Sequence, residues 1–406
     1  MDVPYIPQIN SNNQFYRINP QTYERTEIPS TTLIISNNKL GKGAQGVVYK
    51  GIYKLNDNAE KPVAVKKVIM SDSKKLFITG IYNEVKTLSQ INNDGVIKFI
   101  DFICDDKYYY LVLELIEGCD LVNFVLMGWF RKLSKLTQLN IFLQCAEIIS
   151  FLHKNNIVHL DIKLENIMLT PIAKKSLIDD LSFHVTFIDF SFSKMDIKDD
   201  QYLNLFAGSI QFVDPDTMAH KPYLGKKADI WAFGVTIHRT LAVNNLFDVE
   251  DDELFVERIL SKHPIDFSFP EIKDYVPLLK TILVYNSQKR PDILTIIKEL
   301  KEIEKKIIND NNNDDNDNDG SDNDDIDHPL AFVTFPELFT NKMNDNNKDN
   351  DEDNNQDNED NEDNEDNEDN EDNEDSICQK KNHDEKSKWF TFSNSLPSLR
   401  ELPSFW

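Results

Sequence analysis

Apolar residues follow two different spacings along the chain, and the change from one to the other divides the sequence into two parts. Residues 31–116 contain short runs of β-branched and aromatic residues separated by Asn, Asp and Gly, a pattern typical of strands. These runs are TLII, GVVYKGIY, PVAVKKVI and KYYYLVLELI. One stretch of helical character, residues 74–91, interrupts them, so the first part predicts a small β-rich lobe with one main helix.

From residue 133 onward the apolar residues recur at helical spacing instead. One apolar face is formed by Leu139, Phe142, Ala146, Ile149 and Leu152. Residues 229–241 are apolar nearly all round, which indicates a helix buried inside a lobe. Pro291 suits the first turn of a last helix, which reaches about residue 307. The predicted fold class is therefore α+β, with a small β-rich lobe followed by a larger α-helical lobe.

The two ends of the chain lack both spacings. Residues 1–30 are polar and are expected to form a flexible N-terminal extension. Residues 309–387 are rich in Asn, Asp and Glu and have too little apolar area to offset the entropy of an ordered chain. We therefore expect one folded domain over 31–308 and a disordered acidic segment over 309–387. The aromatic segment 388–406 is expected to dock onto the domain or onto a partner, because its rings are costly to leave in water.

Charge distinguishes the predicted disordered segment from the predicted domain. The 406 residues include 70 acidic and 44 basic ones, which give a formal net charge of −26. Residues 309–376 hold 28 of the acidic and two of the basic residues, so the remaining chain has 42 of each and is neutral. The acidity therefore describes the predicted disordered segment and not the domain. We expect no nucleic-acid partner.

Other features concern the setting of the protein. The four cysteines are scattered without a C-x-x-C pair, and residues 1–10 have neither the basic nor the apolar part of a secretory signal. No apolar run approaches the roughly 18 residues that span a bilayer. These features predict an intracellular, cytoplasmic protein with no membrane segment.

The first candidate for chemistry is a run of three glycines between two predicted strands. Gly41, Gly43 and Gly46 would let a hairpin backbone approach phosphates closely, although many such turns bind nothing. A strand follows them and not a helix, which disfavours a dinucleotide-binding fold. Lys66 ends the next apolar strand, and Glu84 in the helical stretch is placed to hold its ammonium group. The pair makes a phosphate-orienting cation plausible.

A second segment carries the residues that phosphoryl transfer requires. The reaction needs a carboxylate to accept the proton of the nucleophile, a cation to neutralise the migrating group, and oxygen atoms to hold metal. Asp161, Lys163 and Asn166 offer one of each on a short loop between apolar runs. Asp189 ends a further apolar strand and offers a second metal ligand.

These landmarks, in this order over about residues 33–307, resemble the protein kinase superfamily, and the spacing Asp-x-Lys-x-x-Asn resembles its serine/threonine type. The resemblance implies the two-lobed protein kinase fold and transfer of the ATP γ-phosphate to Ser or Thr hydroxyls of protein substrates. By the same resemblance Asp161 is the catalytic base and Lys163 steadies the γ-phosphate. Asn166 and Asp189 hold Mg²⁺ or Mn²⁺.

The resemblance also implies a set of ATP-binding residues. They are Leu40, Gly41, Gly43, Gly46, Val48, Ala64, Lys66, Glu84, Glu114, Ile116 and Met168. The glycines would cover the phosphates, and Lys66 would contact the α- and β-phosphates while paired with Glu84. The hinge from Glu114 to Ile116 would bind adenine, whose ring would lie between apolar side chains.

Three positions depart from the family pattern. Leu160, in His159-Leu160-Asp161, stands where most members have the Arg that binds an activation-loop phosphate, so we expect activity that does not depend on phosphorylation there. Ser191 replaces a glycine and should restrict the backbone. Asp214-Pro215-Asp216 replaces Ala-Pro-Glu, and we expect Asp216 to pair with Arg290.

Two classes of function remain open. One is an active serine/threonine kinase, and the other is a catalytically weak pseudokinase scaffold that binds ATP and partners. The sequence retains Lys66, Asp161, Asn166 and Asp189, whose loss would have favoured the scaffold. The residues therefore favour the enzyme.

Overall fold

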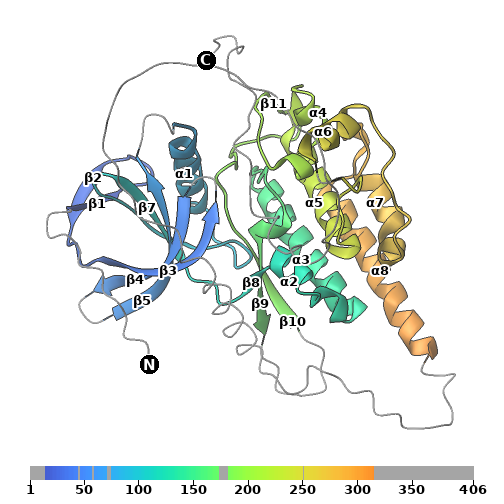
Figure 1. The fold of residues 1–406 in the computed structure, drawn as a ribbon, viewed down its shortest axis with the longest axis horizontal. Coiled ribbons are helices and arrows are strands. Elements are labelled where there is room, and N and C mark those ends of the chain that lie inside the picture. Colours follow the sequence, from blue (N-terminus) through green and yellow to red (C-terminus); the bar gives the residue numbers. More distant parts are fainter. Residues whose placement is uncertain are drawn as a thin grey trace, which may run out of the picture. The chain divides into compact units, whose positions relative to one another are not determined.

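Figure 1 shows a computed structural model of the protein. It describes residues 14–43, 46–56, 59–70, 75–172, 182–249 and 251–314. Most of the segment predicted to be disordered, and all of the aromatic segment 388–406, lie outside these residues. Within the described chain no helix is both long enough and apolar enough to cross a membrane.

The N-terminal half is built around one antiparallel sheet of seven strands. Its order is β2-β1-β6-β7-β5-β4-β3. The strands span Phe15–Ile18 (β1), Arg25–Ile28 (β2), Leu33–Gly43 (β3), Gly46–Asn56 (β4), Ala59–Ile69 (β5), Phe99–Cys104 (β6) and Tyr108–Glu114 (β7). Alternate residues of β5 enter opposite core clusters, Val63 and Val65 on one face and Ala64 and Val68 on the other. The sheet is therefore buried on both faces along this strand.

One main helix, α1 (Lys75–Leu88), packs on the sheet, as the sequence predicts. Its Ile81, Val85 and Leu88 are buried in the larger core cluster. These side chains leave the neighbouring positions Tyr82 and Glu84 to contact other parts of the lobe.

The expectation of a flexible extension over 1–30 is wrong for its described part. Strands β1 and β2 form a hairpin, and β1 continues the sheet by pairing with the edge of β6. Phe15, Ile18 and Ile28 are buried in this arrangement. The sequence shows little of this because each strand has only four residues, half of the eight are polar, and the pairing partner is a strand edge far along the chain.

The C-terminal half is mainly helical (Figure 1). Its helices are α2 (Leu121–Leu126), α3 (Lys135–Lys154), α4 (Pro215–Met218), α5 (Gly225–Ala242), α6 (Asp252–Leu260), α7 (Val276–Ile282) and α8 (Ile293–Asp314). Short strands complete it: β8 (Cys119–Asp120), β9 (Ile167–Ile172), β10 (Ser182–Phe187), β11 (Tyr202–Leu203) and β12 (Tyr223–Leu224). The predicted α+β class with two lobes of unequal composition is confirmed.

Two helices refine the sequence predictions. Helix α5 has 15 of its 18 residues buried, so it is the central helix that residues 229–241 predicted. Helix α8 begins two residues after Pro291, and the Asp292 carboxylate caps it by accepting the Thr295 amide at 2.8 Å. It also runs six residues into the segment predicted to be disordered, because no glycine or proline follows Ile308 to stop it before Asp314.

Candidate active site

A cluster of one buried lysine, one buried carboxylate and one half-buried carboxylate joins α1 to the loop after β10. The Lys66 ammonium lies 2.7 Å from Glu84 Oε2 and 3.2 Å from Asp189 Oδ1. Lys66 comes from β5, where the pairing Lys66↔Leu111 holds its backbone inside the sheet. The structure therefore brings together three of the residues that the sequence singled out.

The charges in this cluster support one another. Burial alone would lower the pKa of Lys66, but the carboxylates of Asp189 and Glu84 raise it above its ordinary value. Burial alone would raise the pKa of Asp189, but Lys66 holds it well below its usual range. Lys66 therefore stays charged, with an ionised Asp189 beside it. Burial raises the pKa of Glu84, which is only 1% exposed.

Gly41 and Gly43 at the end of β3 and Gly46 at the start of β4 differ in what surrounds them. A side chain at Gly46 would meet the carbonyl oxygen of Lys67 at 2.3 Å, so the hairpin itself requires this glycine. Among the residues that the structure describes, none lies within 4 Å of a Cβ placed at Gly41 or Gly43. Packing against the described residues therefore does not demand glycine at these two positions.

Among the residues expected around adenine, Leu40, Val48, Ala64 and Glu114 lie on neighbouring strands of the seven-stranded sheet, whereas Ile116 follows β7 and Met168 lies on β9. In β4 and β5, Val48 pairs with Lys66, and Ala64 pairs with Leu113 of β7. Ala64 is buried, whereas Val48, Glu114, Ile116 and Met168 are half-buried and Leu40 is exposed. The half-buried apolar side chains retain area that a flat ring could cover.

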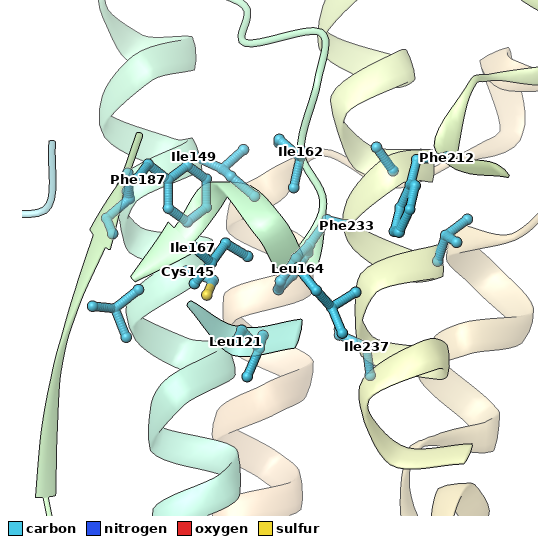
Figure 2. Packing of buried hydrophobic residues seen from close by; sticks show 14 of the residues in the cluster. Leu121, Cys145, Ile149, Ile162, Leu164, Ile167, Phe187, Phe212, Phe233 and Ile237 are labelled. Atoms are coloured by element: carbon cyan, nitrogen blue, oxygen red, sulfur yellow. The ribbon is translucent and has the colours of Figure 1, made fainter. Parts of the chain in front are cut away.

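An apolar layer anchors the loop that carries Asp161 and Lys163. The alternating residues Ile162 and Leu164 are buried, at 1% and 2% exposed. Figure 2 shows them in a layer with Ile149 of α3 and Phe233 and Ile237 of α5. The polar residues Asp161 and Lys163, which alternate with them, are thereby turned away from this layer.

The carboxylate of Asp161 is held by four hydrogen bonds. Its Oδ1 accepts the backbone N–H and the hydroxyl of Ser209, both at 2.9 Å. Its Oδ2 lies 2.9 Å from Lys163 Nζ and accepts Asn166 Nδ2 at 3.0 Å. Lys163 Nζ also donates to Ser209 Oγ at 2.7 Å. A carboxylate, an ammonium and a hydroxyl thus form one fixed group.

Asp189 and Asn166 suit a divalent metal that also binds phosphate. Asn166 uses Nδ2 for its bonds to Asp161, which leaves its oxygen Oδ1 as a ligand atom. The Asp189 side chain is 34% exposed. The backbone of Asp189 has φ of +58°, a strained conformation that directs the side chain beside Lys66. The described residues contain no cage of three or more metal-ligating acids, histidines or cysteines. Mg²⁺ needs none, because it commonly takes one or two protein ligands together with substrate phosphates.

A buried aspartate on α5 holds the backbone just before Asp161. Asp229 accepts the amide N–H groups of His159 at 3.0 Å and Leu160 at 2.8 Å. Leu160 has φ of +64°, which is costly for a branched residue, and these bonds keep it in that conformation. The ring of His159 packs 4.6 Å from the ring of Phe190, the residue after Asp189. The two loops of the site therefore contact each other through a buried ring pair.

Leu160 enters an apolar cluster with residues 192–207, part of the segment that follows Asp189. Its members are Val158, Leu160, Ile197, Leu203, Ala207, Tyr223 and Ala228, with Phe192 and Leu205 packed against them. The same segment pairs through β11 with β12. It also crosses Leu160 so closely at Gly208 that a Cβ there would lie 2.6 Å from the Leu160 carbonyl oxygen, with φ of +100°. Only glycine fits this crossing.

The expected pair between Asp216 and Arg290 is wrong. Asp214 makes the buried ion pair with Arg290, and its Oδ1 also caps α4 by accepting the amide of Asp216 at 2.8 Å. Asp216 instead accepts the Ser287 hydroxyl at 2.9 Å. The helix that begins at Pro215 places Asp214 at its N-terminus, facing Arg290, and turns Asp216 one step away.

Sequence reasoning missed two contacts of the site. The hydroxyl of Ser193 lies 2.8 Å from that of Thr87 on α1, and it donates to the Phe190 carbonyl at 2.6 Å. Both residues are buried, so they join α1 to the segment after Asp189. The role of Ser209 as a partner of Asp161 was also missed. Its position directly after Gly208 singles out Ser209, but the sequence does not show which residue its hydroxyl will bond.

The comparison with family models identifies the class of protein. A model described as "Protein kinase domain" matches residues 34–303, about two thirds of the chain, so the chain belongs to the protein kinase family. Among curated proteins it is 28% identical over 272 residues to "Serine/threonine-protein kinase ULK3" of Xenopus laevis, covering 66% of this chain and 54% of that one.

Two further relatives carry similar names. The chain is 26% identical over 294 residues to "Probable serine/threonine-protein kinase KIN1 homolog" of Enterocytozoon bieneusi, covering 71% of this chain and 45% of that protein. It is 27% identical over 277 residues to "Serine/threonine-protein kinase KIN4" of Saccharomyces cerevisiae, covering 64% and 33%. The chain therefore spans about half or less of the length of these relatives. The family accounts for ATP and a divalent metal as cosubstrate and cofactor in general terms.

Proposed function

We propose that the protein is an active serine/threonine protein kinase that transfers the γ-phosphate of ATP to Ser or Thr hydroxyls of protein substrates. The observation that carries the proposal is the group formed by Asp161, Lys163 and Ser209 together with the Lys66–Glu84 pair. All of these contacts are present at once in the structure.

Each residue has a task that its surroundings support. Asp161 accepts the proton of the substrate hydroxyl, because its bonds to Asn166 and Ser209 fix the direction of its carboxylate. Lys163 neutralises charge on the migrating phosphoryl group, since Asp161 raises its pKa against the effect of burial. Lys66 orients the α- and β-phosphates. Asn166 and Asp189 would hold a divalent metal, which would offset the negative charge of the phosphates.

We further propose that this activity does not depend on phosphorylation of the activation segment, residues 189–216. The cluster around Leu160 replaces the contact between an arginine and a phosphate by apolar packing. An exposed ion pair adds to it, with Lys226 Nζ 2.5 Å from Asp199. Packing of apolar side chains stabilises the segment without any covalent modification.

The hydroxyl groups of the segment support the same conclusion. Between residues 189 and 216 the sequence has three serines and no threonine. Ser191 and Ser193 are buried, and Ser209 is bonded to Asp161. Tyr202 is 53% exposed, but its side chain is a phenol and not a Ser or Thr hydroxyl. The folded activation segment thus offers no accessible Ser or Thr hydroxyl as a phosphate acceptor.

The setting and partners follow from the same proposal. Protein substrates would be met inside the cell, in the cytoplasm, which suits three free buried thiols, Cys104, Cys119 and Cys145. We also propose that segment 388–406 docks onto the domain or a partner, for which its aromatic composition is the support.

The test is phosphate transfer from radiolabelled ATP to a generic Ser/Thr-containing protein. Asp161→Asn, which keeps the shape of the side chain, should lower the rate at least about 100-fold, as loss of a general base does. Asp94→Asn is the matched control. It removes only an exposed ion pair with Lys98 and should stay within about twofold of wild type. A wild-type rate no higher than that of Asp161→Asn would contradict the enzyme and favour a pseudokinase scaffold.

A further inference from the structure

The N-terminal hairpin contacts the helix that carries Glu84. Strand β1 pairs with β6 through Tyr16↔Cys104 and Arg17↔Ile103, so the hairpin is an integral edge of the sheet. Its turn, residues 19–24, lies toward α1. At the tip, the ring of Tyr23 packs edge-on against the ring of Tyr82 of α1, with centroids 5.2 Å apart and planes at 76°.

The turn is built to hold Tyr23 in one place. Asn19 Oδ1 accepts the amides of Gln21 at 2.8 Å and Thr22 at 3.1 Å, and the Tyr23 amide donates to the Asn19 carbonyl at 2.8 Å. Tyr23 itself has φ of +60°, an unfavourable conformation for an aromatic residue that persists only where other contacts impose it. The ring is therefore presented to α1 by a rigid turn and not by a loose end.

The base of the hairpin is fixed as firmly as its tip. Arg17 Nε donates to Asp101 Oδ2 at 2.8 Å, and Arg17 Nη2 donates to the Tyr53 hydroxyl at 2.9 Å. The Tyr53 hydroxyl in turn donates to the same Asp101 oxygen at 2.6 Å. This network ties β1 to strands β4 and β6 of the sheet.

Tyr82 connects this hairpin to the site. Its ring also packs edge-on against Phe102 and Tyr109 of the sheet, at 5.5 and 5.6 Å. It precedes Glu84 by two residues on α1, so the two side chains leave the helix in widely different directions. Contact on the Tyr82 side therefore fixes the rotation of α1, and that rotation decides whether Glu84 reaches Lys66.

We infer that the hairpin formed by residues 15–28 positions α1 for catalysis, with Tyr23 acting on Glu84 through Tyr82. The inference rests on the proposed kinase function. Tyr23 is a positioning residue, because it touches neither substrate nor the reacting atoms. On the other side of the helix Thr87 contacts Ser193, so α1 is held between the hairpin and the activation segment.

The central test compares Tyr23→Ala with Tyr23→Phe in the full chain. Loss of an edge-to-face ring contact should lower kcat roughly three- to tenfold, with KM for the protein substrate within about twofold of wild type. Tyr23→Phe keeps the ring and should restore the wild-type kcat. Leu294→Ala is the matched control, because it also removes a partly exposed apolar side chain, but one that lies on α8, outside the sheet and α1. It should leave kcat unchanged.

A second readout does not require activity. Hydrogen exchange of the amides in residues 79–88 should be faster in Tyr23→Ala than in wild type, while α3 exchanges at the same rate in both. Tyr23→Ala that matches wild type in both kcat and exchange would overturn the inference. Equal acceleration in α1 and α3 would also overturn it, because it would indicate general destabilisation. If wild type transfers no phosphate, the proposed kinase function fails, and the exchange measurement still decides the coupling of hairpin and helix.

Discussion

The side chains of Lys66 and Leu160 are both buried beside the same site, but their surroundings differ in kind. Lys66 lies between two carboxylates, Glu84 and Asp189, and this charged cluster aligns groups that bind phosphate and metal. Leu160 lies among apolar side chains, and this apolar cluster holds the activation segment. The charged cluster is ordered by direction-dependent polar contacts, and the apolar cluster is ordered by burial of apolar surface.

The difference explains why the residue types of the charged cluster are fixed, whereas the activation segment can be held in more than one way. A transferring phosphoryl group requires charges at fixed positions, and no apolar side chain supplies them. A segment that only has to stay in place can be held by a phosphate and arginine or by apolar packing. We propose that Leu160 uses the second solution, so that the departure from the family pattern affects regulation and leaves the chemistry intact.

The largest effect is expected from breaking the charged cluster. Asp189→Asn removes the proposed metal ligand and the negative charge nearest Lys66, and it should lower kcat at least about 100-fold. The fold should persist, because Glu84 still pairs with the buried ammonium. Activity would be measured together with the thermal midpoint. A variant that keeps more than a tenth of the wild-type rate would argue against this role.

Breaking the apolar cluster should act on stability first. Leu160→Ala leaves a cavity and should lower the free energy of unfolding by about 2–5 kcal/mol, with a loss of activity that follows the looser segment. Leu160→Met conserves volume and is the matched control, expected to cost less than about 1.5 kcal/mol. Denaturant unfolding and initial rates would be compared. If Leu160→Ala were as stable as Leu160→Met, the cluster would not be holding the segment.

Lowering the pH should reduce stability through two buried, neutral histidines. Burial lowers the pKa of His159 and of His238, so both remain neutral in the folded protein below the ordinary value of about 6.5. The unfolded chain then binds more protons, and the free energy of unfolding should fall between pH 7 and 5 by up to about 1.4 kcal/mol per unit per histidine.

Lys66 and Asp189 should contribute nothing to that fall, and Glu84 can only oppose it, because burial raises its pKa and the folded state takes up its proton first. The pKa of Asp189 is depressed, so its contribution is complete above the unfolded value of about 3.9 and is lost only at lower pH. Lys66 has a raised pKa and stays protonated throughout. Thermal midpoints from pH 7 to 5 would show the effect, and His238→Gln should flatten the curve. If His238→Gln left the pH dependence of the thermal midpoint unchanged, His238 would not be a cause of the fall.

The smallest effect concerns the exposed pair that supports the apolar cluster. Lys226→Met removes the contact with Asp199 and should cost about 0.2–1 kcal/mol, since exposed ion pairs are screened by water and salt. Raising the salt concentration should reduce the difference between wild type and variant. A larger, salt-independent loss would show that this pair and not Leu160 dominates.

The sequence predicts more of the charged cluster than of the apolar one. Lys66 and Asp189 are polar residues in apolar surroundings at spacings that few other folds require, so they could be found without a structure. The partners of Leu160 are ordinary apolar residues scattered over residues 158–228, and nothing in their spacing shows that they meet.

Two errors have a similar physical origin. Asp214 and Asp216 are equally able to pair with Arg290 by charge, and only the direction of the short helix α4 decides between them. The hairpin of residues 15–28 depends on the free edge of β6, a long-range contact that a local pattern of four-residue strands does not contain. Local signals predicted elements and residue types, whereas pairings set by tertiary structure remained undetermined.

The central claim is that the site is assembled without a phosphate on the activation segment. The direct measurement is kcat of protein shown by intact mass to carry no phosphate, compared with the same protein after incubation with ATP. We predict equal values within about twofold, because the cluster around Leu160 already holds the segment. A tenfold or greater rise that accompanies phosphate on residues 189–216, at Tyr202 or any serine, would contradict the account.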